Sequence, residues 1–251
     1  MGATLTRSAV VRDRHPILVL WALPRAVSTA FERMIIERGD HHVFDEPFSR
    51  HYYFGPERVS ARYTEVLPES RPTEILAGLE AAAEQRPVFV KDMAYHVDGF
   101  ASPELLDRFV NTFLIRDPGY ALPSLAAKWP DFTDAERGYA ALARLIGLAE
   151  SVGQDPPIVD SDDLCRDPSA TVRAYCERVG IPFLPESLTW AAGMRPEWEL
   201  WRDWYEATAR STGFRPPPAT PPPSRDEPRL VRAYADCAPI YQQLRARRLR
   251  P

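Results

Sequence analysis

The chain has 251 residues, of which 45% are hydrophobic and 26% are charged, a balance typical of one folded domain with a substantial core and not of a disordered chain. The net charge of −4 provides no basic field for a nucleic-acid backbone, which argues against DNA or RNA as the main partner. The three cysteines are odd in number and far apart, so neither a disulfide framework nor a metal site is indicated.

The first informative stretch runs from Ile17 to Met34 and reads ILVLWALPRAVSTAFERM. A short apolar run is followed by a proline break and then by apolar residues spaced three and four apart, with Gly39 at the expected end. This pattern predicts a buried parallel strand, a tight loop and a helix packed on a sheet. The apolar run is too short to span a membrane and no signal sequence precedes it, so we expect a cytoplasmic protein.

The loop between this strand and helix carries one cation, Arg25, and two hydroxyl groups, Ser28 and Thr29. Unpaired N–H groups and the helix dipole attract phosphate or sulfate to such a turn, although most serines and threonines there are only helix caps. The Walker pattern GxxxxGK[ST] is absent, because this stretch contains no glycine. We therefore expect an anion-binding loop that does not belong to an ordinary nucleotide kinase or ATPase.

The second predicted strand lies within residues 41–48 and ends in Asp45 and Glu46. The carboxyl ends of strands in α/β sheets carry the chemistry, so both carboxylates are expected near the first loop. Residues 49–71 contain many aromatic residues and arginines without a clean period. They are interpreted as a lid or as a wall of an acceptor site.

The rest of the chain alternates between helical and strand patterns. Helices are predicted over 73–84, near 103–109, over 134–150 and over 168–179, and strands over 88–91, 112–116 and 157–160. The alternation predicts a parallel sheet with helices on both faces. The segment 195–210 carries Trp198, Trp201, Trp204 and Tyr205 near helical spacing, which is more often typical of core than of a binding site.

Six prolines between 216 and 223 indicate an extended linker, and an amphipathic pattern follows it. The predicted organisation is a flexible arm over 1–14, one domain over 15–214, a proline-rich linker over 215–228 and a C-terminal helix over 229–251 that packs on the domain. No repeat and no second core is apparent.

A second motif, Phe113 to Ser124, reads FLIRDPGYALPS. Arg116 at the end of a buried strand and Ser124 on the following helix could close on one small dianion. The alternative is structural, with Arg116 paired to Asp117 and the serine turned toward its own helix. The motif by itself leaves the two interpretations equal.

Together, WALPRAVSTAFERM, FLIRDPGYALPS and a third stretch, VDSDDLCRDPSATVRAYCERVGIPF, resemble the P-loop sulfotransferases. The segments DEPF, GPER and VFVKDM further resemble a divergent set of sulfotransferase-like proteins. The resemblance covers roughly residues 16–190 in the family's order. It implies a three-layer α/β fold with a mostly parallel sheet, and the donor 3′-phosphoadenosine 5′-phosphosulfate, which leaves as adenosine 3′,5′-bisphosphate.

The resemblance also implies which residues bind the donor. The first loop would hold the 5′-phosphosulfate, and Arg116 with Ser124 would hold the 3′-phosphate. The residues of that loop are Pro24, Arg25, Ala26, Val27, Ser28 and Thr29.

The chain departs from the family at several positions. The lysine of eukaryotic cytosolic members is replaced by Arg25, and the loop glycine of a bacterial version is replaced by Val27. The motif K-x-H is Lys91-Asp92-Met93 here, without its histidine, and the late glycine-rich loop is not recognisable. The adenine and 3′-phosphate site must therefore be completed in another way.

Sulfuryl transfer, by analogy with phosphoryl transfer, passes in line through a loose transition state, so positioning and electrostatics dominate and no metal is required. Arg25 would neutralise the leaving phosphate. The first choice for the base is Glu46, whose alternative is an ion pair with an arginine. His96 is the second choice, although a lone histidine is more often structural, and Asp92 is the third.

The leading hypothesis is transfer of a sulfuryl group to a hydroxyl or amine of a small acceptor, apolar or aromatic, without nucleic-acid or membrane partners. A P-loop small-molecule kinase would instead require magnesium and prefer ATP. A non-catalytic relative, used for binding or as a scaffold, would tolerate loss of Arg25 or Glu46. The sequence leaves the acceptor and the oligomeric state open, a homodimer included.

Overall fold

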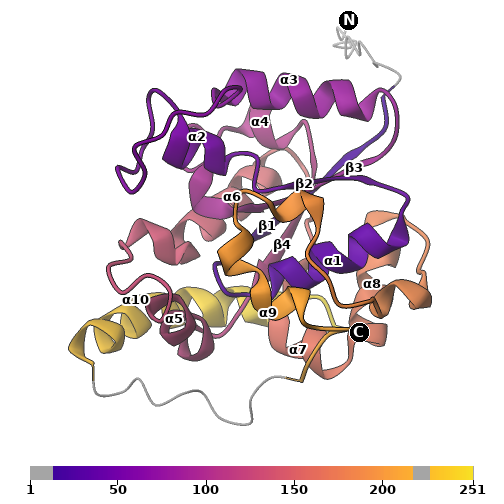
Figure 1. The fold of residues 1–251 in the computed structure, drawn as a ribbon. Coiled ribbons are helices and arrows are strands. Elements are labelled where there is room, and N and C mark those ends of the chain that lie inside the picture. The colour runs from indigo at the N-terminus through magenta and orange to yellow at the C-terminus, as the bar shows by residue number, and fades with distance from the viewer. Residues whose placement is uncertain (1–13, 217–226, 251) are drawn as a thin grey trace, which may run out of the picture.

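A computed structural model describes residues 14–216 and 227–250, so most of the predicted arm and linker lies outside the described residues. The centre is a five-stranded sheet in the order β2-β3-β1-β4-β5, and every neighbouring pair is parallel. The strands are β1 (Ile17–Ala22), β2 (His42–Asp45), β3 (Val88–Met93), β4 (Val110–Ile115) and β5 (Ile158–Asp160). The predicted α/β fold with a parallel sheet is confirmed (Figure 1).

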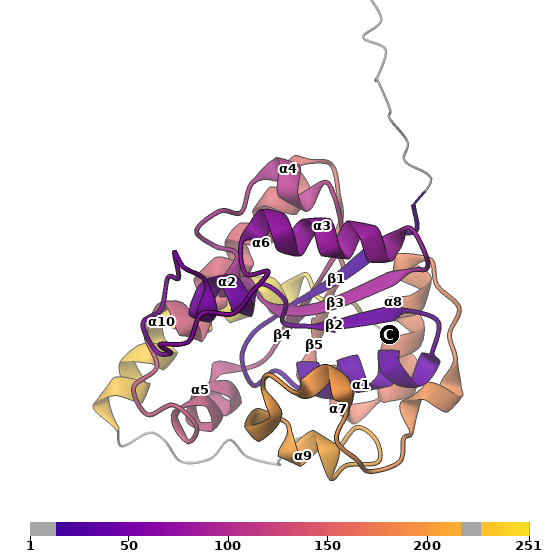
Figure 2. The same cartoon turned by 45° about the horizontal axis from the view of Figure 1, so that its top comes forward.

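Helices cover both faces of this sheet (Figure 2). On one face lie α3 (Pro72–Ala83) and α6 (Tyr139–Ser151), and on the other lie α1 (Ser28–Arg38) and α8 (Pro168–Val179). Because both faces are covered, β1 and β3 are buried along their whole length, and β1 and the first half of β3 are apolar without alternation. The other helices are α2 (Ser49–Phe54), α4 (Pro103–Leu106), α5 (Pro118–Ala126), α7 (Ser161–Arg166), α9 (Glu206–Ala209) and α10 (Pro228–Ala246).

Local signals mark the ends of two helices on the same face. Gly39 ends α1 with a φ of 71°, and Gly180 ends α8 with a φ of 75°, a left-handed conformation that glycine adopts without steric cost. The Asp167 carboxylate accepts a hydrogen bond of 3.0 Å from the Ala170 N–H and caps α8. These features place both helices where the sequence predicted them.

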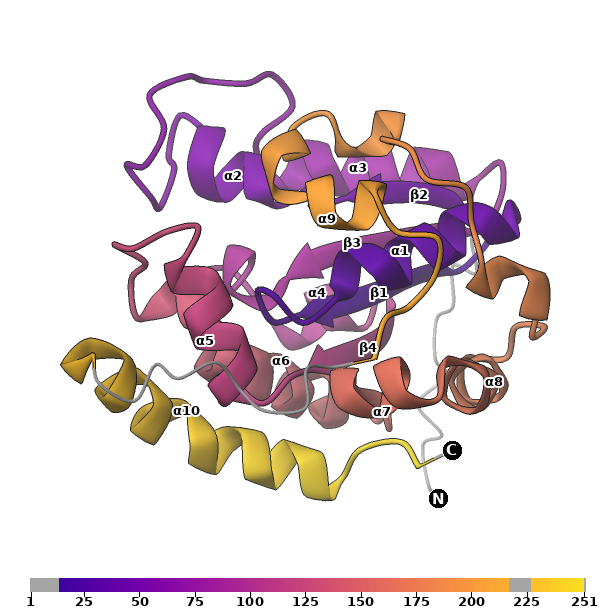
Figure 3. The ribbon, with the colours of Figure 1, turned by 60° about the horizontal axis from the view of Figure 1, so that its bottom comes forward.

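The long helix α10 lies along α5 and α6 (Figure 3). The Tyr241 hydroxyl donates a 3.0 Å hydrogen bond to the Asp160 carboxylate at the end of β5. The Leu249 N–H donates to the Ile158 carbonyl at 2.8 Å. The last described residues are therefore fixed to the edge strand. None of the helices in the described part of the chain is long and apolar enough to cross a membrane.

The segment 195–210 differs from the near-helical pattern in the sequence. It forms two 3₁₀ turns, Pro196–Trp198 and Arg202–Trp204, followed by α9. The Trp198 indole donates to the Glu32 carboxylate at 3.2 Å, and the Trp201 indole donates to the Ser49 hydroxyl at 3.1 Å. A buried indole N–H needs an acceptor, and these acceptors belong to α1 and α2, so the chain bends to reach both.

Candidate active site

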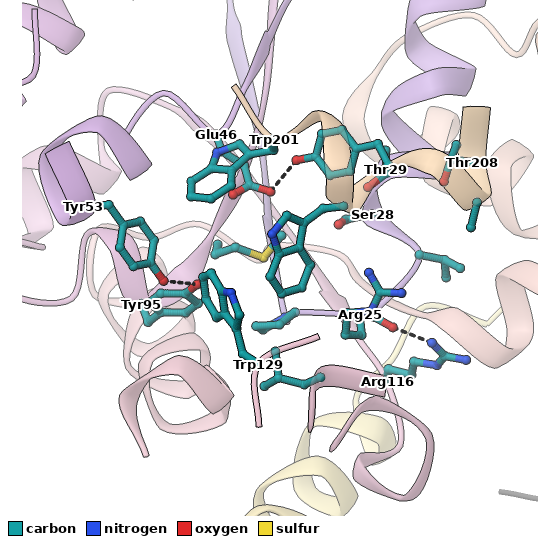
Figure 4. A pocket seen from close by; sticks show the side chains of 17 residues that line it. Arg25, Ser28, Thr29, Glu46, Tyr53, Tyr95, Arg116, Trp129, Trp201 and Thr208 are labelled. Carbon is teal, nitrogen blue, oxygen red and sulfur yellow. Dashed lines mark hydrogen bonds between the residues drawn. The ribbon is translucent and has the colours of Figure 1, made fainter. Parts of the chain in front are cut away.

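A cavity lies at the carboxyl edge of the sheet, where the chain leaves β1, β2, β3 and β4 (Figure 4). Its walls include the loop after β1, Glu46 after β2, Tyr95 after β3 and Arg116 after β4. Parallel strands bring their carboxyl ends to one edge, which explains how residues distant in sequence meet. The cavity therefore unites the two motifs that the sequence analysis singled out.

The loop after β1 turns sharply before α1. Arg25 has a φ of 62° and Val27 a φ of 59°, a left-handed conformation that is costly for residues other than glycine. No side chain caps α1 at Val27. Among the described residues, no acceptor takes the N–H groups of Ser28 and Thr29. The loop thus presents free donors at a helix N-terminus, as an anion site requires.

Two guanidinium groups approach each other at this loop. Arg25 Nε donates to the Ser124 hydroxyl at 2.9 Å, and Arg116 donates to the Arg25 carbonyl oxygen. Burial, together with the like charge of Arg116, lowers the pKa of Arg25. Neither arginine forms an ion pair with a carboxylate in the described ranges, and Arg116 Nε is buried without a hydrogen-bond partner there. Such an arrangement favours a bound anion.

Three other residues of the two motifs make contacts that the sequence analysis did not predict. Ser124 does not line the cavity but binds Arg25 instead of sharing a site directly with Arg116. Ala26 is buried, and its carbonyl accepts a 2.7 Å hydrogen bond from the Ser161 hydroxyl. The Asp117 carboxylate accepts the Gly119 N–H at 2.7 Å. Asp117 therefore caps α5, and among the described residues it forms no ion pair with Arg116, unlike in the structural alternative for the motif.

Glu46 reaches the cavity from the opposite wall. Its backbone has a φ of 46°, and its Oε1 accepts hydrogen bonds from Lys91 Nζ and the Tyr205 hydroxyl, both at 2.7 Å. Burial is the largest single influence and opposes ionisation of this carboxylate, but the charges of Lys91 and His96 and the hydrogen bonds from Lys91 and Tyr205 together lower the pKa of Glu46. Glu46 is consequently an ionised carboxylate at the cavity wall, facing the loop that carries Arg25 (Figure 4).

Lys91 lies behind Glu46 among three carboxylates. It forms an ion pair with Asp45, and its Nζ lies 3.8 Å from Glu32 Oε2. Burial raises the pKa of Asp45 to about 7 and that of Glu32 well above its usual range. The sequence analysis missed Glu32 and did not identify Lys91 as a partner of Glu46. The available signal was a lysine directly after the apolar run 88–90 of a buried strand.

His96 and Asp92 are not among the residues that line the cavity. His96 Nδ1 lies 2.6 Å from Asp92 Oδ1, and Asp92 Oδ2 accepts the Phe48 N–H at 2.7 Å. Both side chains are fully buried. Their geometry fits a structural pair that joins the end of β3 to the start of α2.

Aromatic side chains complete the cavity. Trp201, Trp204 and Tyr205 come from the segment 195–210, and Tyr53 comes from α2. The Arg25 guanidinium lies 5.7 Å from the Trp204 ring centroid, a cation–π contact. The interpretation of this tryptophan segment as core was incomplete, because a residue can be buried in the fold and still form a cavity wall.

The chain is similar to several known proteins. A family model described as "Sulfotransferase domain" matches residues 17–248. Two curated Arabidopsis thaliana proteins, branched-chain-amino-acid aminotransferase-like proteins 2 and 1, are each 31% identical to this chain, over 91% and 80% of its length. The chain spans only 41% and 37% of those two relatives.

A solved structure, the sulfotransferase domain from the Synechococcus PCC 7002 olefin synthase, shares the fold. It has a TM-score of 0.51 at 20% sequence identity, with 90% of this chain and 96% of that domain covered. The family model extends across nearly all of the described residues and includes both the loop after β1 and Arg116. The chain therefore belongs to the sulfotransferase family.

Proposed function

We propose that this protein transfers a sulfuryl group from 3′-phosphoadenosine 5′-phosphosulfate to a hydroxyl or amine of a small acceptor. The observation that carries the proposal is the meeting of Arg25, Arg116 and Glu46 at one cavity. Two cations without a carboxylate partner in the described residues face an ionised carboxylate across that cavity. Family membership supports the reaction class.

The residues present fit this donor. The free N–H groups of Ser28 and Thr29 suit the 5′-phosphosulfate, and the unpartnered Arg116 Nε suits a second phosphate. The Arg25 guanidinium lies between these positions, held by Ser124 and by the Trp204 ring. When bound, the donor supplies an activated sulfuryl group attached to a good leaving group.

The chain would contribute charge and position. Arg25 would stabilise the negative charge that develops on the leaving phosphate, since a guanidinium stays protonated. Glu46 would orient the acceptor group and take its proton, from the wall opposite Arg25. A carboxylate held ionised by Lys91 is ready for this role at neutral pH. The low pKa of Glu46 makes it a weak base, which suits a loose transition state in which the proton leaves late.

The aromatic wall supports an apolar or aromatic acceptor. Trp129, Trp201 and Tyr95 border the side of the cavity away from Arg116 (Figure 4). Flat apolar surfaces bind aromatic or aliphatic groups by burial and exclude water from the reacting atoms. Such a wall provides few polar groups to bind a strongly polar acceptor.

Calorimetric titration with adenosine 3′,5′-bisphosphate, beside AMP and Mg·ATP, tests the proposal. Micromolar binding that requires the 3′-phosphate is the expected result. A second step measures transfer from radiolabelled donor to a panel of phenols, aliphatic alcohols and amines. Preference for Mg·ATP would replace the proposal with a kinase, and absence of binding to all three nucleotides would indicate a non-catalytic relative.

A further inference from the structure

The Tyr205 hydroxyl lies between two carboxylates that follow one another in the chain. Its oxygen is 2.7 Å from Glu46 Oε1 and 3.0 Å from Asp45 Oδ1. Lys91 Nζ donates to the same hydroxyl at 2.8 Å and forms ion pairs with both carboxylates. A hydroxyl donates only one proton, so at any moment it can serve one of the two carboxylates.

The two carboxylates differ in their access to the cavity. Glu46 lines the cavity, whereas the side chain of Asp45 is fully buried behind it. Asp45 Oδ2 is buried without a hydrogen-bond partner among the residues that the structure describes. An ionised carboxylate with an unsatisfied oxygen is costly to bury, and protonation relieves that cost. The interior thus holds a carboxylate suited to receiving a proton, one hydroxyl away from the reacting side.

We propose that the proton lost by the acceptor comes to rest on Asp45, and that the Tyr205 hydroxyl carries it there from Glu46. This inference rests on the proposed sulfuryl transfer. It makes Glu46 a transient base and gives Asp45 and Tyr205 roles that act through Glu46. Asp45 and Tyr205 are accordingly positioning residues in the proton path and not groups that contact the acceptor.

The step balances in atoms and charge. Glu46 takes the acceptor's proton as the new bond forms between the acceptor oxygen or nitrogen and sulfur, and the bond from sulfur to the phosphate oxygen breaks, with the electron pair leaving on the phosphate. Glu46 then gives a proton to the Tyr205 oxygen while the original Tyr205 proton moves to Asp45. Glu46 returns to its ionised form, and Tyr205 is unchanged. The reverse route delivers the proton to water after the product leaves.

The charges around the path favour this direction. Three groups face Asp45 besides Tyr205: Glu32 from α1, Glu46 and the Lys91 ammonium. Burial raises the pKa of Asp45 to about 7, whereas the Lys91 charge, opposing the effect of burial, lowers the pKa of Glu46, with a smaller contribution from His96. A proton shared by the two carboxylates therefore resides on Asp45.

Infrared spectroscopy of the 251-residue chain tests the resting place of the proton without an acceptor. We expect a carbonyl-stretch band of a protonated carboxyl group that disappears as the pH rises through about 7. The band should be lost in Asp45→Asn and kept in Glu206→Gln, which removes an exposed carboxylate, whereas Glu32→Gln removes the other buried carboxyl group whose pKa is raised. Loss of the band in Glu32→Gln alone, or no band titrating near neutrality, would overturn the proposal.

Slow hydrolysis of 3′-phosphoadenosine 5′-phosphosulfate, followed by release of adenosine 3′,5′-bisphosphate, tests the path with water as acceptor. The rate of the wild-type protein should rise with pH through about 7, as Asp45 becomes free to accept, and Asp45→Asn should lose this dependence. Tyr205→Phe should lower the rate about 10-fold or more without changing nucleotide affinity. An unaltered pH profile in Asp45→Asn would refute the proposed proton transfer from Glu46 through Tyr205 to Asp45.

Calorimetry with adenosine 3′,5′-bisphosphate on the same variants separates the two possible failures. If wild-type protein does not bind this nucleotide, the proposed function fails. The other case is that the protein binds the nucleotide with the 3′-phosphate required, while the infrared band and the pH profile are the same in Asp45→Asn as in wild type. In that case only the proposed proton transfer from Glu46 to Asp45 fails.

Discussion

The Arg116 guanidinium donates a hydrogen bond to the main-chain carbonyl oxygen of Arg25. This contact fixes the loop that carries the Arg25 side chain. Both side chains line the same cavity, and burial and the like charge of Arg116 lower the pKa of Arg25. Bringing two cations together costs free energy unless an anion joins them. This relationship is the strongest structural argument for a dianionic ligand.

Replacement of Arg116 by alanine should weaken binding of adenosine 3′,5′-bisphosphate by about 2–4 kcal/mol, the scale for loss of a charge-assisted partner. Titration calorimetry measures the change. Arg166→Ala serves as the control, because Arg166 on α7 is exposed and pairs with Asp163. An affinity equal to that of the wild type would remove Arg116 from the donor site.

Replacement of Glu46 by glutamine should lower turnover by at least about 10²-fold while nucleotide affinity stays nearly constant, because glutamine cannot accept the proton. Steady-state kinetics with an acceptor found in the panel, beside calorimetry, separates the two effects. Glu206→Gln removes an exposed carboxylate from α9 and should leave both quantities unchanged. Full activity in Glu46→Gln would require another base, and His96 would become the next residue to test.

Val27 offers a test of backbone strain in the anion-binding loop. Its φ of 59° is costly for any residue with a Cβ atom, so Val27→Gly should be more stable than Val27→Ala by about 1 kcal/mol. Urea unfolding measures the free energy of unfolding of the two variants. Both lack the valine side chain, so the difference between them reports the backbone conformation. If alanine is the more stable of the two, the left-handed conformation is not strained in solution.

Arg62 holds the loop of residues 55–71 to the rest of the fold. It pairs with Glu136 at 3.0 Å and stacks on Trp129 at 4.1 Å from the ring centroid. Since Glu136 is buried, Arg62→Ala should destabilise the protein by about 3 kcal/mol through an uncompensated charge. Urea unfolding should show a far smaller effect for Arg144→Ala, whose partner Asp98 is more exposed. Equal effects of the two variants would contradict this assignment.

The raised pKa of Asp45 predicts how stability depends on pH. Between the ordinary value of 3.8 and the folded value of about 7, the folded protein binds more protons at Asp45 than the unfolded chain does. The stabilisation from this proton is present at low pH and is lost as the pH rises through about 7. The melting temperature of Asp45→Asn, relative to wild type, should therefore rise between about pH 5 and pH 8. A constant difference would show that Asp45 is ionised throughout.

Much of the fold could be predicted from the sequence because its signals are local. The apolar runs of β1, β3 and β4 need no partner information to predict buried strands, and Gly39 and Gly180 mark helix ends by their own backbone freedom. The alternation of strands and helices then predicts a parallel sheet, whose carboxyl edge must carry Arg25 and Arg116. The family resemblance rested on these same motifs.

Long-range contacts escaped prediction because no local pattern encodes them. The place of Lys91 between Glu46 and Glu32 depends on how β3 packs against β2 and α1, and the anchoring of Tyr205 on Glu46 joins residues 159 positions apart. His96 had the chemistry of a base and pairs with Asp92 only four residues away, but the long-range bond from the Phe48 N–H to Asp92 joins this pair to the start of α2, away from the cavity. The sequence by itself determined the parallel sheet, the alternation of strands and helices along the chain and the tight loop after the first strand, because these follow from periodicity and backbone preference. Tertiary structure alone decided which buried charges meet, because that depends on distances between elements.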